Sequence, residues 1–198
     1  MVPLECPHAT GQACSPRALI HQYPSLPVEE EGRLNDPHLR ENFVERVFAY
    51  RRLRSFFSSR WTLGGLVQFH TAHKLVLMAH SPKAYSELGR FVANAKRLAR
   101  DKVPEYYELA FMKALKKLAT TARHTNVLHH MLGYLRPHLR WRCMRRTSHA
   151  YRGLPTRPCA AGRADRALSA LGAKVRYRLF AQVYLEPHPK ELMLRNHV

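Results

Sequence analysis

Acidic residues are scarce in this chain of 198 residues: 14 Asp and Glu stand against 33 Lys and Arg, which gives a formal net charge of +19. A protein so poor in carboxylates attracts anions, and polyanions such as RNA most strongly. The same excess of charge is also typical of a solvated surface that only keeps a protein in solution. Charge alone therefore leaves an RNA-binding surface and a plain basic surface equally open.

Long apolar runs are absent as well. No stretch of 18 or more consecutive apolar residues occurs, so we expect no transmembrane helix and no membrane partner. Residues 1–20 lack the apolar core of a secretory signal, so we expect no such signal and a cytoplasmic location. The hydrophobic content of 45% is nevertheless sufficient for a buried core.

Cysteine is rare, and no two cysteines form a C-x-x-C pair. The four are Cys6, Cys14, Cys143 and Cys159. Because cytosolic thiols stay reduced, we expect neither a metal site nor a disulfide framework from them. The chain also has no Gly-rich phosphate loop, no Gly-x-Ser-x-Gly turn and no nucleophile–base pair. We therefore expect no complete catalytic site in this chain alone.

What is present is a helical pattern. Five segments between residues 36 and 139 place apolar residues at three- and four-residue spacing. Their start signals are Asp36-Pro37, Thr62, Ser81-Pro82, residues 101–104, and Thr125. The first helix is predicted to run from Pro37 to Ser58, and Pro137 is predicted to end the fifth.

These segments predict an all-α fold: a compact five-helix bundle with irregular N- and C-terminal segments. Residues 21–36 are predicted to be an extended approach and a turn, because Pro24, Pro27 and Gly32 oppose a helix. The residues predicted to face the interior are Phe43, Val47, Phe48, Leu53 and Phe56; Leu66, Phe69, Leu77 and Met78; Tyr85, Leu88 and Val92; Tyr107, Phe111, Leu115 and Leu118; and Leu128, Met131, Leu132 and Leu135.

Positive charge gathers in clusters. Residues 36–139 hold 18 Lys and Arg and 7 Asp and Glu, a net +11, and residues 140–181 hold 11 and 1, a net +10. In the first helix, Tyr50 precedes Arg51, Arg52 and Arg54. Guanidinium groups contact phosphates and tyrosine stacks on unpaired bases, although a solvated helix end has the same composition. Further basic groups are Lys113, Lys116 and Lys117, and Lys96, Arg97 and Arg100.

Three histidines share one face of the second predicted helix. His70, His73 and His80 lie at offsets of three and seven. Imidazoles on one face can ligate a metal, but the spacing is not i, i+4 and no carboxylate lies in the same turn, so we expect no metal. Contact with a phosphate, helped by the adjacent Lys74, and a structural role inside the bundle both stay open.

Arg123, His124, Thr125 and Asn126 lie at the predicted start of the fifth helix. Free N–H groups at a helix N-terminus, beside Arg and His, are a natural binding site for an anion. A plain cap by Thr125 or Asn126 explains the same residues without any ligand.

Several stretches resemble one family of bacterial proteins. They are Leu26-Pro-Val-Glu-Glu-Glu-Gly-Arg-Leu34, Arg40-Glu-Asn-Phe-Val-Glu-Arg-Val-Phe-Ala-Tyr50, Phe69-His-Thr-Ala-His-Lys74, Met78-Ala-His-Ser-Pro82, Arg123-His-Thr-Asn-Val-Leu128, Gly133-Tyr-Leu135, Gln182-Val-Tyr-Leu-Glu-Pro-His-Pro189 and Glu191-Leu-Met-Leu-Arg-Asn-His-Val198. In this order and at these lengths, they resemble the YbgA family, a helical domain of long-uncertain function.

In many members of that family the helical domain follows a small iron–sulfur domain of the thiouracil-desulfurase type. The resemblance implies that residues 36–139 hold RNA, with tRNA as the expected class, while a desulfurase partner removes sulfur from thiolated uracil. Residues 26–34 look like the tail of that partner domain. Residues 1–35 are therefore expected to be its remnant, with little order before residue 20.

The chain departs from the family in two places. The cluster-binding cysteines of the desulfurase domain are not matched here, so we expect no cofactor in this chain. Residues 140–181 are rich in Arg, Ala, Pro and Cys but hold a single acid, and they do not match the family pattern. We hypothesise that this segment, expected to have little order, is an out-of-frame reading of GC-rich DNA. Residues 182–198 return to the family pattern.

The leading hypothesis from the sequence is a YbgA-like accessory domain that binds RNA for a desulfurase. The residues predicted to contact the RNA are His70, His73, Lys74, Arg123, His124, Asn126 and Arg51. Two alternatives stay open: the helical domain is itself an enzyme with a His-based site, or it is a protein-interaction module. A truncated or frameshifted family member is also consistent with the sequence.

Overall fold

The computed structural model describes residues 16–135 together with residues 183, 184 and 187. Within these residues all regular secondary structure is helical, which confirms the all-α prediction. The elements are α1 (Pro16–Gln22), the 3-10 helix η1 (Glu31–Asn35), α2 (Pro37–Ser58), α3 (Leu63–His80), α4 (Pro82–Asn94), the 3-10 helix η2 (Ala95–Arg97), α5 (Lys102–Leu115) and α6 (Thr121–Leu135). The helices α2 to α6 are the five that the sequence predicts.

Side-chain caps fix the first three of these helices where the sequence predicts them. The Asp36 carboxylate accepts hydrogen bonds from two backbone N–H groups of the first turn of α2, at 2.7 and 3.3 Å, and Pro37 occupies the first helical position. The bond to the N–H of His38 is the main cause that lowers the pKa of Asp36. Thr62 caps α3 and Ser81 caps α4 in the same way.

The predicted start of the last helix is wrong by one turn. Helix α6 begins at Thr121, and the hydroxyl of Thr120 accepts the backbone N–H of Arg123 at 3.4 Å. Thr125 lies inside the helix, where its hydroxyl donates to the carbonyl of Thr121 at 2.9 Å. Two threonines offered the same capping chemistry, and the helix uses the earlier one because that adds a turn.

The approach to the bundle, predicted as an extended chain and a turn over residues 21–36, is non-helical at residues 23–30 and has a short helical segment on either side. Helix α1 ends at Gln22, and η1 forms one short turn just before α2. The turn is held by ion pairs: Glu29 bonds Arg33 at 2.9 Å and Arg46 of α2 at 3.1 Å. The approach is therefore fastened to the bundle through Arg46, whose side chain is buried.

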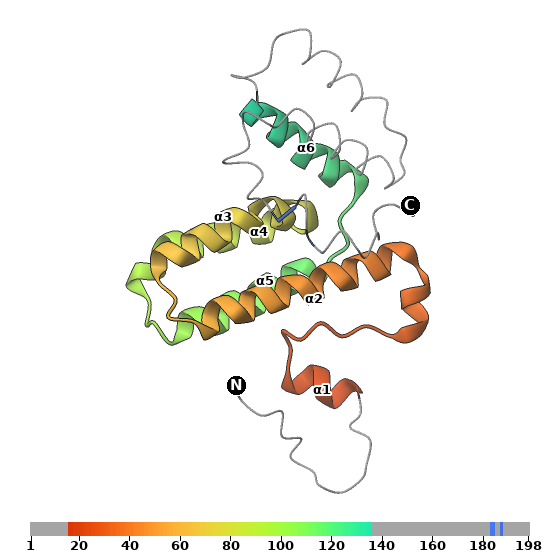
Figure 1. The fold of residues 1–198 in the computed structure, drawn as a ribbon, viewed down its shortest axis with the longest axis horizontal. Helices are drawn as coiled ribbons and strands as arrows, with labels where there is room; N and C mark the ends of the chain where they lie inside the picture. Colours follow the sequence, from red (N-terminus) through yellow and green to blue (C-terminus); the bar gives the residue numbers. More distant parts are fainter. Residues whose placement is uncertain (1–15, 136–182, 185–186, 188–198) are drawn as a thin grey trace, which may run out of the picture.

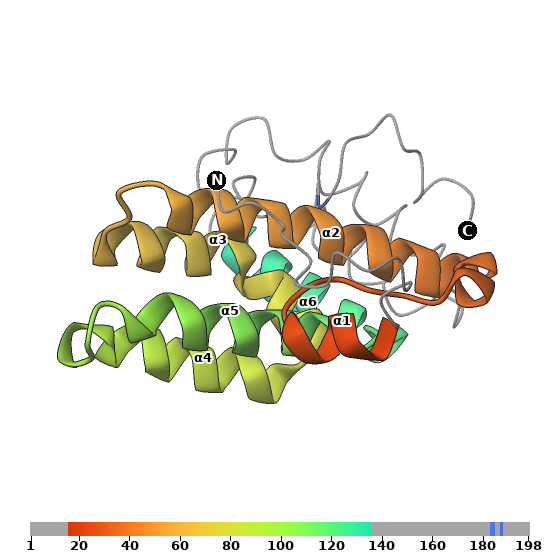
Figure 2. The ribbon, with the colours of Figure 1, turned by 90° about the horizontal axis from the view of Figure 1, so that it is seen from below.

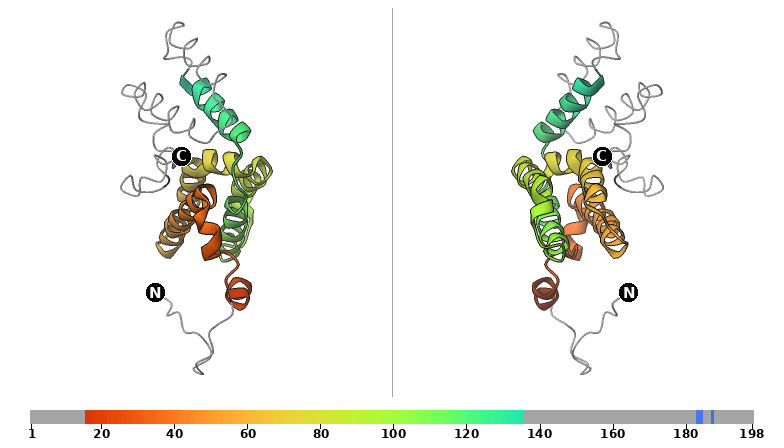
Figure 3. Two further views of the ribbon diagram at one scale, coloured as in Figure 1. Left: turned by 90° about the vertical axis from the view of Figure 1, so that its right-hand side faces the viewer. Right: turned by 90° about the vertical axis from the view of Figure 1, so that its left-hand side faces the viewer.

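Four helices form two antiparallel hairpins that stack on each other. Helices α2 and α3 make one layer and α4 and α5 make the other (Figures 1 and 2). Helix α6 packs on α3 at one end, and α1 lies at the opposite end (Figure 3). No helix among the described residues is long and apolar enough to cross a membrane.

The core fills the space between the two hairpins and under α6. Its largest fully buried side chains are Tyr107, Tyr184, Phe111, Leu53, Leu66, Leu75, Leu77, Leu88, Leu115, Leu128 and Met131. Two residues predicted to face inward do not: Val47 is 39% exposed and Leu118 is 43% exposed. Leu118 follows the last turn of α5, which ends at Leu115, so the helical spacing no longer applies to it.

The C-terminal part of the chain contributes to this core. The backbone N–H of Val183 donates to the carbonyl of Ala72 in α3 at 3.0 Å, and the Tyr184 side chain is only 2% exposed. Arg52 of α2 donates to the carbonyl of Pro187 at 2.9 Å. The predictions for residues 140–181, little order and an out-of-frame origin, concern positions outside the described residues. Of residues 1–35, the structure describes those from residue 16 onward, which include α1 and η1.

Candidate nucleic-acid interface

His70 is buried between α3, α4 and α5. Its Nδ1 atom lies 3.0 Å from the hydroxyl of Tyr107, its ring stacks parallel to Tyr85, and the residue is 9% exposed. Burial, helped by the charge of Lys74, lowers the pKa of His70. The same burial raises the pKa of the Tyr107 hydroxyl. The pair is therefore neutral and holds the two hairpins together.

His73 lies deeper, with 2% of its surface exposed. Its Nδ1 atom bonds the carbonyl of Phe69 one turn earlier at 2.9 Å, and its ring stacks on the Phe69 ring at 4.1 Å. Burial is the main cause that lowers the pKa of His73 to about 4. Its Nε2 atom and the Nε atom of Arg52 are buried without a hydrogen-bond partner.

His80 forms a buried ion pair across the α2–α3 hairpin. Its Nε2 atom lies 3.3 Å from Oε2 of Glu45, and its Nδ1 atom lies 2.6 Å from the carbonyl of Lys117. Burial alone would lower the pKa of His80, but the charge and hydrogen bond of Glu45 outweigh it, and the pKa is raised. Both ring nitrogens are thus occupied by protein groups.

These three rings share a helix face, as predicted, but each is bonded to a different partner. Among the described residues, no group of three or more His, Cys, Asp or Glu could hold a metal ion. Since His70 and His73 are buried, they are removed from the set of side chains that can contact RNA. The sequence identified the face correctly but did not show that it points inward.

The run at the start of α6 is engaged with the protein. The Arg123 guanidinium donates to the carbonyl of His80 at 2.9 Å, and the Nδ1 atom of His124 lies 2.8 Å from the hydroxyl of Tyr184. The Asn126 amide contacts the sulfur of Met78 at 3.8 Å. Because α6 starts a turn earlier, the backbone N–H groups of Arg123 and His124 bond Thr120. The predicted anion site is thereby lost.

The two remaining predicted residues lie apart from this run. Arg51 is exposed on α2, and Lys74 of α3 is half-buried. The structure therefore brings His80, Arg123 and His124 together but does not bring Arg51 to them.

A pocket of about 400 Å³ opens beside the Glu45–His80 pair. It is lined by His38, Glu41, Asn42, Glu45, His80, Leu118, Ala119, Thr120, Thr121 and His124. Asn42 donates to the carbonyl of Leu115 at 3.1 Å, so it ties α2 to the end of α5. This is where a His-based enzyme site would lie, but neither nitrogen of His80 is left for a substrate.

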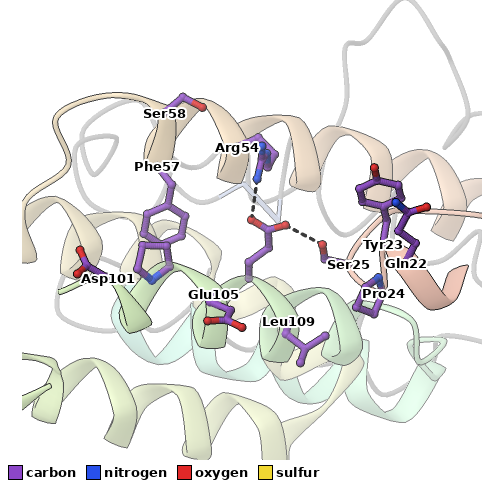
Figure 4. A pocket seen from close by; sticks show the side chains of 12 residues that line it. Gln22, Tyr23, Pro24, Ser25, Arg54, Phe57, Ser58, Asp101, Glu105 and Leu109 are labelled. Carbon is purple, nitrogen blue, oxygen red and sulfur yellow. Dashed lines mark hydrogen bonds and ion pairs between the residues drawn. The ribbon is translucent and has the colours of Figure 1, made fainter. Parts of the chain in front are cut away.

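A second pocket, of about 580 Å³, lies between α2, α5 and the turn after α1 (Figure 4). Its lining includes the carboxylates of Asp101, Glu105 and Glu108. Glu108 accepts a hydrogen bond from the hydroxyl of Ser25 at 2.7 Å and pairs with Arg54 at 3.5 Å (Figure 4). Three acids and one base, Arg54, therefore line this side of α5.

The neighbouring side of α5 is basic. A groove of about 410 Å³ between α4 and α5 is lined by Ser81, Lys83, Ala84, Glu87, Leu88, Tyr106, Leu109, Ala110, Lys113, Ala114 and Lys117. We call this the α4–α5 groove. Lys83, Lys113 and Lys117 are exposed, and the single acid of the groove, Glu87, lies 3.9 Å from Lys83. Tyr106 is 53% exposed.

A sequence signal for this groove exists in α5. Tyr106 and Lys113 are seven residues apart, which places them on one face of α5, and Lys117 follows the end of that helix. The buried residues Tyr107 and Phe111 lie on the next face. The sequence indicates Lys113 and Lys117 as part of a basic cluster. It does not single out Tyr106, because the neighbouring Tyr107 accounts for the apolar stripe of this helix.

The exposed charge of the described residues is strongly basic. Fourteen Lys and Arg are exposed, against six Asp and Glu. In the α4–α5 groove, three lysines face one glutamate. Most of the positive charge of the helical domain therefore faces solvent, although the predicted histidines do not.

Two comparisons with known proteins find similar sequences. The family model described as "Protein of unknown function (DUF1722)" matches residues 74–148. The "Uncharacterized protein YbgA" of Escherichia coli (strain K12) is 37% identical over 95 residues, which are 48% of this chain and 56% of that protein. The chain is similar to this protein over that part of its length. It spans about half the length of the curated relative it matches, and no solved structure matches it.

Proposed function

We propose that the YbgA-like domain binds RNA, with tRNA as its class, through the α4–α5 groove. The observation that carries the proposal is the convergence of Lys83, Lys113 and Lys117 on one exposed groove. Lysine ammonium groups bind phosphates and release counterions, which supplies most of the affinity of such a surface. RNA is the polyanion that a cytoplasmic protein with this charge meets most readily.

The acidic pocket beside the groove supports a defined orientation of the RNA. Leu109 lines both, so Asp101, Glu105 and Glu108 lie on one side of α5 and the lysines lie on the other. The excess of carboxylates on the α2 side makes that side less favourable for phosphates than the lysine side. A strand would therefore follow α4 and the C-terminal half of α5.

The proposed partner of this domain is a thiouridine or thiouracil desulfurase, as a fused or separate domain. Support comes from residues 26–34, which look like the tail of such a domain. In this chain the run is attached to α2, since Glu29 pairs with Arg46 at 3.1 Å and Arg46 also donates to the carbonyl of Val28 at 3.0 Å. A preceding domain would then be held at a fixed place relative to the helices.

The test is a salt titration of tRNA binding. The wild-type protein is compared with a Lys113→Gln/Lys117→Gln variant, and with an Arg40→Gln/Arg60→Gln control that removes two exposed charges elsewhere. Affinity should fall steeply between about 50 and 200 mM salt. The groove variant should bind more weakly, with a salt slope reduced by about one per lost phosphate contact.

Three results would contradict the proposal. These are no tRNA binding at about 50 mM salt, an affinity independent of salt, and equal losses in the groove variant and the control.

A further inference from the structure

The side chain of Tyr106 is an exposed aromatic ring on α5. It is 53% exposed, more than any other large hydrophobic side chain of the described residues, and it is the single aromatic one among those that are exposed. Its neighbour Tyr107 is fully buried and supplies the core contact of this turn of α5.

One face of the Tyr106 ring is covered by another aromatic ring. It stacks on Phe91 of α4, with ring centroids 4.4 Å apart and planes inclined by 27°. Phe91 is half-buried and packs against the core, so it fixes the position of the Tyr106 ring. A ring held in this way loses little conformational entropy when a second flat group stacks on it.

The lysines of the α4–α5 groove line the same surface as the Tyr106 ring. At 1.5 Å per helical residue, Lys113 lies about 10 Å farther along α5. Lys117 follows shortly after the helix ends at Leu115. Lys83 borders the same groove from α4. An aromatic ring and three cations thus line one groove on the surface.

This combination distinguishes single-stranded from duplex RNA. In a duplex the faces of the bases are covered by their neighbours, and a protein reaches phosphates, 2′-hydroxyls and base edges. In a single strand the base faces are free, and an aromatic side chain stacks on any of the four bases. A duplex uses the lysines but gains nothing from the ring.

We infer that the α4–α5 groove binds an unpaired RNA segment, in which one base stacks on Tyr106 while the following phosphates contact Lys113 and Lys117. This inference rests on the proposed RNA-binding function and specifies the form of the RNA. Stacking makes the preference independent of base identity, because every base has a π face.

The experiment measures binding of a fluorescent oligouridine and of a duplex RNA of the same length. Tyr106→Ala should weaken binding of the single strand by about 5- to 100-fold and change binding of the duplex by less than about twofold. Tyr106→Phe keeps the ring and should bind the single strand like the wild type. Val67→Ala shortens an exposed apolar side chain on a different helix, α3, and should change neither affinity.

The outcomes separate the two proposals. If neither RNA binds at low salt, the proposed function and this inference both fail. If both RNAs bind with a salt-dependent affinity but Tyr106→Ala weakens both equally or neither, the inference alone is overturned. Weaker binding of the single strand by Tyr106→Phe would also overturn it, because the hydroxyl and not the ring face would then carry the contact.

Discussion

Glu45 of α2 pairs with His80 of α3 inside the bundle, where Oε2 of the carboxylate lies 3.3 Å from Nε2 of the imidazole. The two residues are 8% and 3% exposed. The second ring nitrogen of His80 bonds the carbonyl of Lys117, and the carbonyl of His80 accepts from Arg123. One histidine therefore connects α2, α3, the end of α5 and α6, so its charge state matters to the stability of the whole fold.

The first prediction is a loss of stability as the pH rises. Because the pKa of His80 is raised in the folded protein, its stabilising effect is fully present below about pH 6.5 and is lost as the pH rises through the raised value. Urea unfolding should show this fall in the wild type. His80→Gln should cost about 3 kcal/mol at about pH 6 and less at about pH 9.

Glu45→Gln serves as a second variant, because it removes the charge that raises the pKa of His80. It should flatten the same part of the stability profile. Parallel profiles for the wild type and both variants between about pH 6 and 9 would refute this account of the pair.

The second prediction concerns acid. The pKa of His73 is about 4 in the folded protein, below the ordinary histidine value of 6.5, so folding favours the neutral ring. Its contribution to stability is present above about pH 6.5 and falls by about 3 kcal/mol as the pH drops through 4. His73→Phe should therefore move the midpoint of acid unfolding, followed by circular dichroism, to lower pH.

His21→Phe is the matched control, since His21 is exposed on α1. It should leave the acid midpoint in place. An unchanged midpoint in His73→Phe would mean that some other group governs acid unfolding.

The third prediction concerns the attachment of the C-terminal part of the chain. The Tyr184 hydroxyl bonds His124 at 2.8 Å, and the ring is buried. Tyr184→Phe should lower the unfolding free energy by about 1 kcal/mol, which lowers Tm by about 2–4 °C. Tyr106→Phe, which removes the hydroxyl of an exposed tyrosine, is the control and should leave Tm unchanged. Equal Tm values for Tyr184→Phe and the wild type would contradict a stabilising bond between Tyr184 and His124.

Local chemistry explains why so much of the fold was predictable. The caps at Asp36, Thr62 and Ser81 depend on residues within one turn, and the five amphipathic stretches depend on spacing along a single helix. Where two nearby residues offered the same cap, as Thr120 and Thr125 did, local chemistry could not decide between them.

The site was less predictable because its partners come from other helices. The spacing of His70 and His73 placed them on one face, but whether that face meets solvent depends on Tyr107 and Phe111 of α5 packing over it. The carboxylate that pairs with His80 is absent from its own helix and is supplied by Glu45. A pattern along one helix contains no information on such neighbours.

The central claim is that RNA binds at the α4–α5 groove, and lysine footprinting tests it most directly. The protein is acetylated briefly with and without tRNA, and the modified lysines are measured by mass spectrometry. The account predicts that tRNA protects Lys83, Lys113 and Lys117, while Lys102 at the acidic end of α5 reacts equally in both samples. Protection confined to lysines outside the groove, or no protection at saturating tRNA, would contradict it.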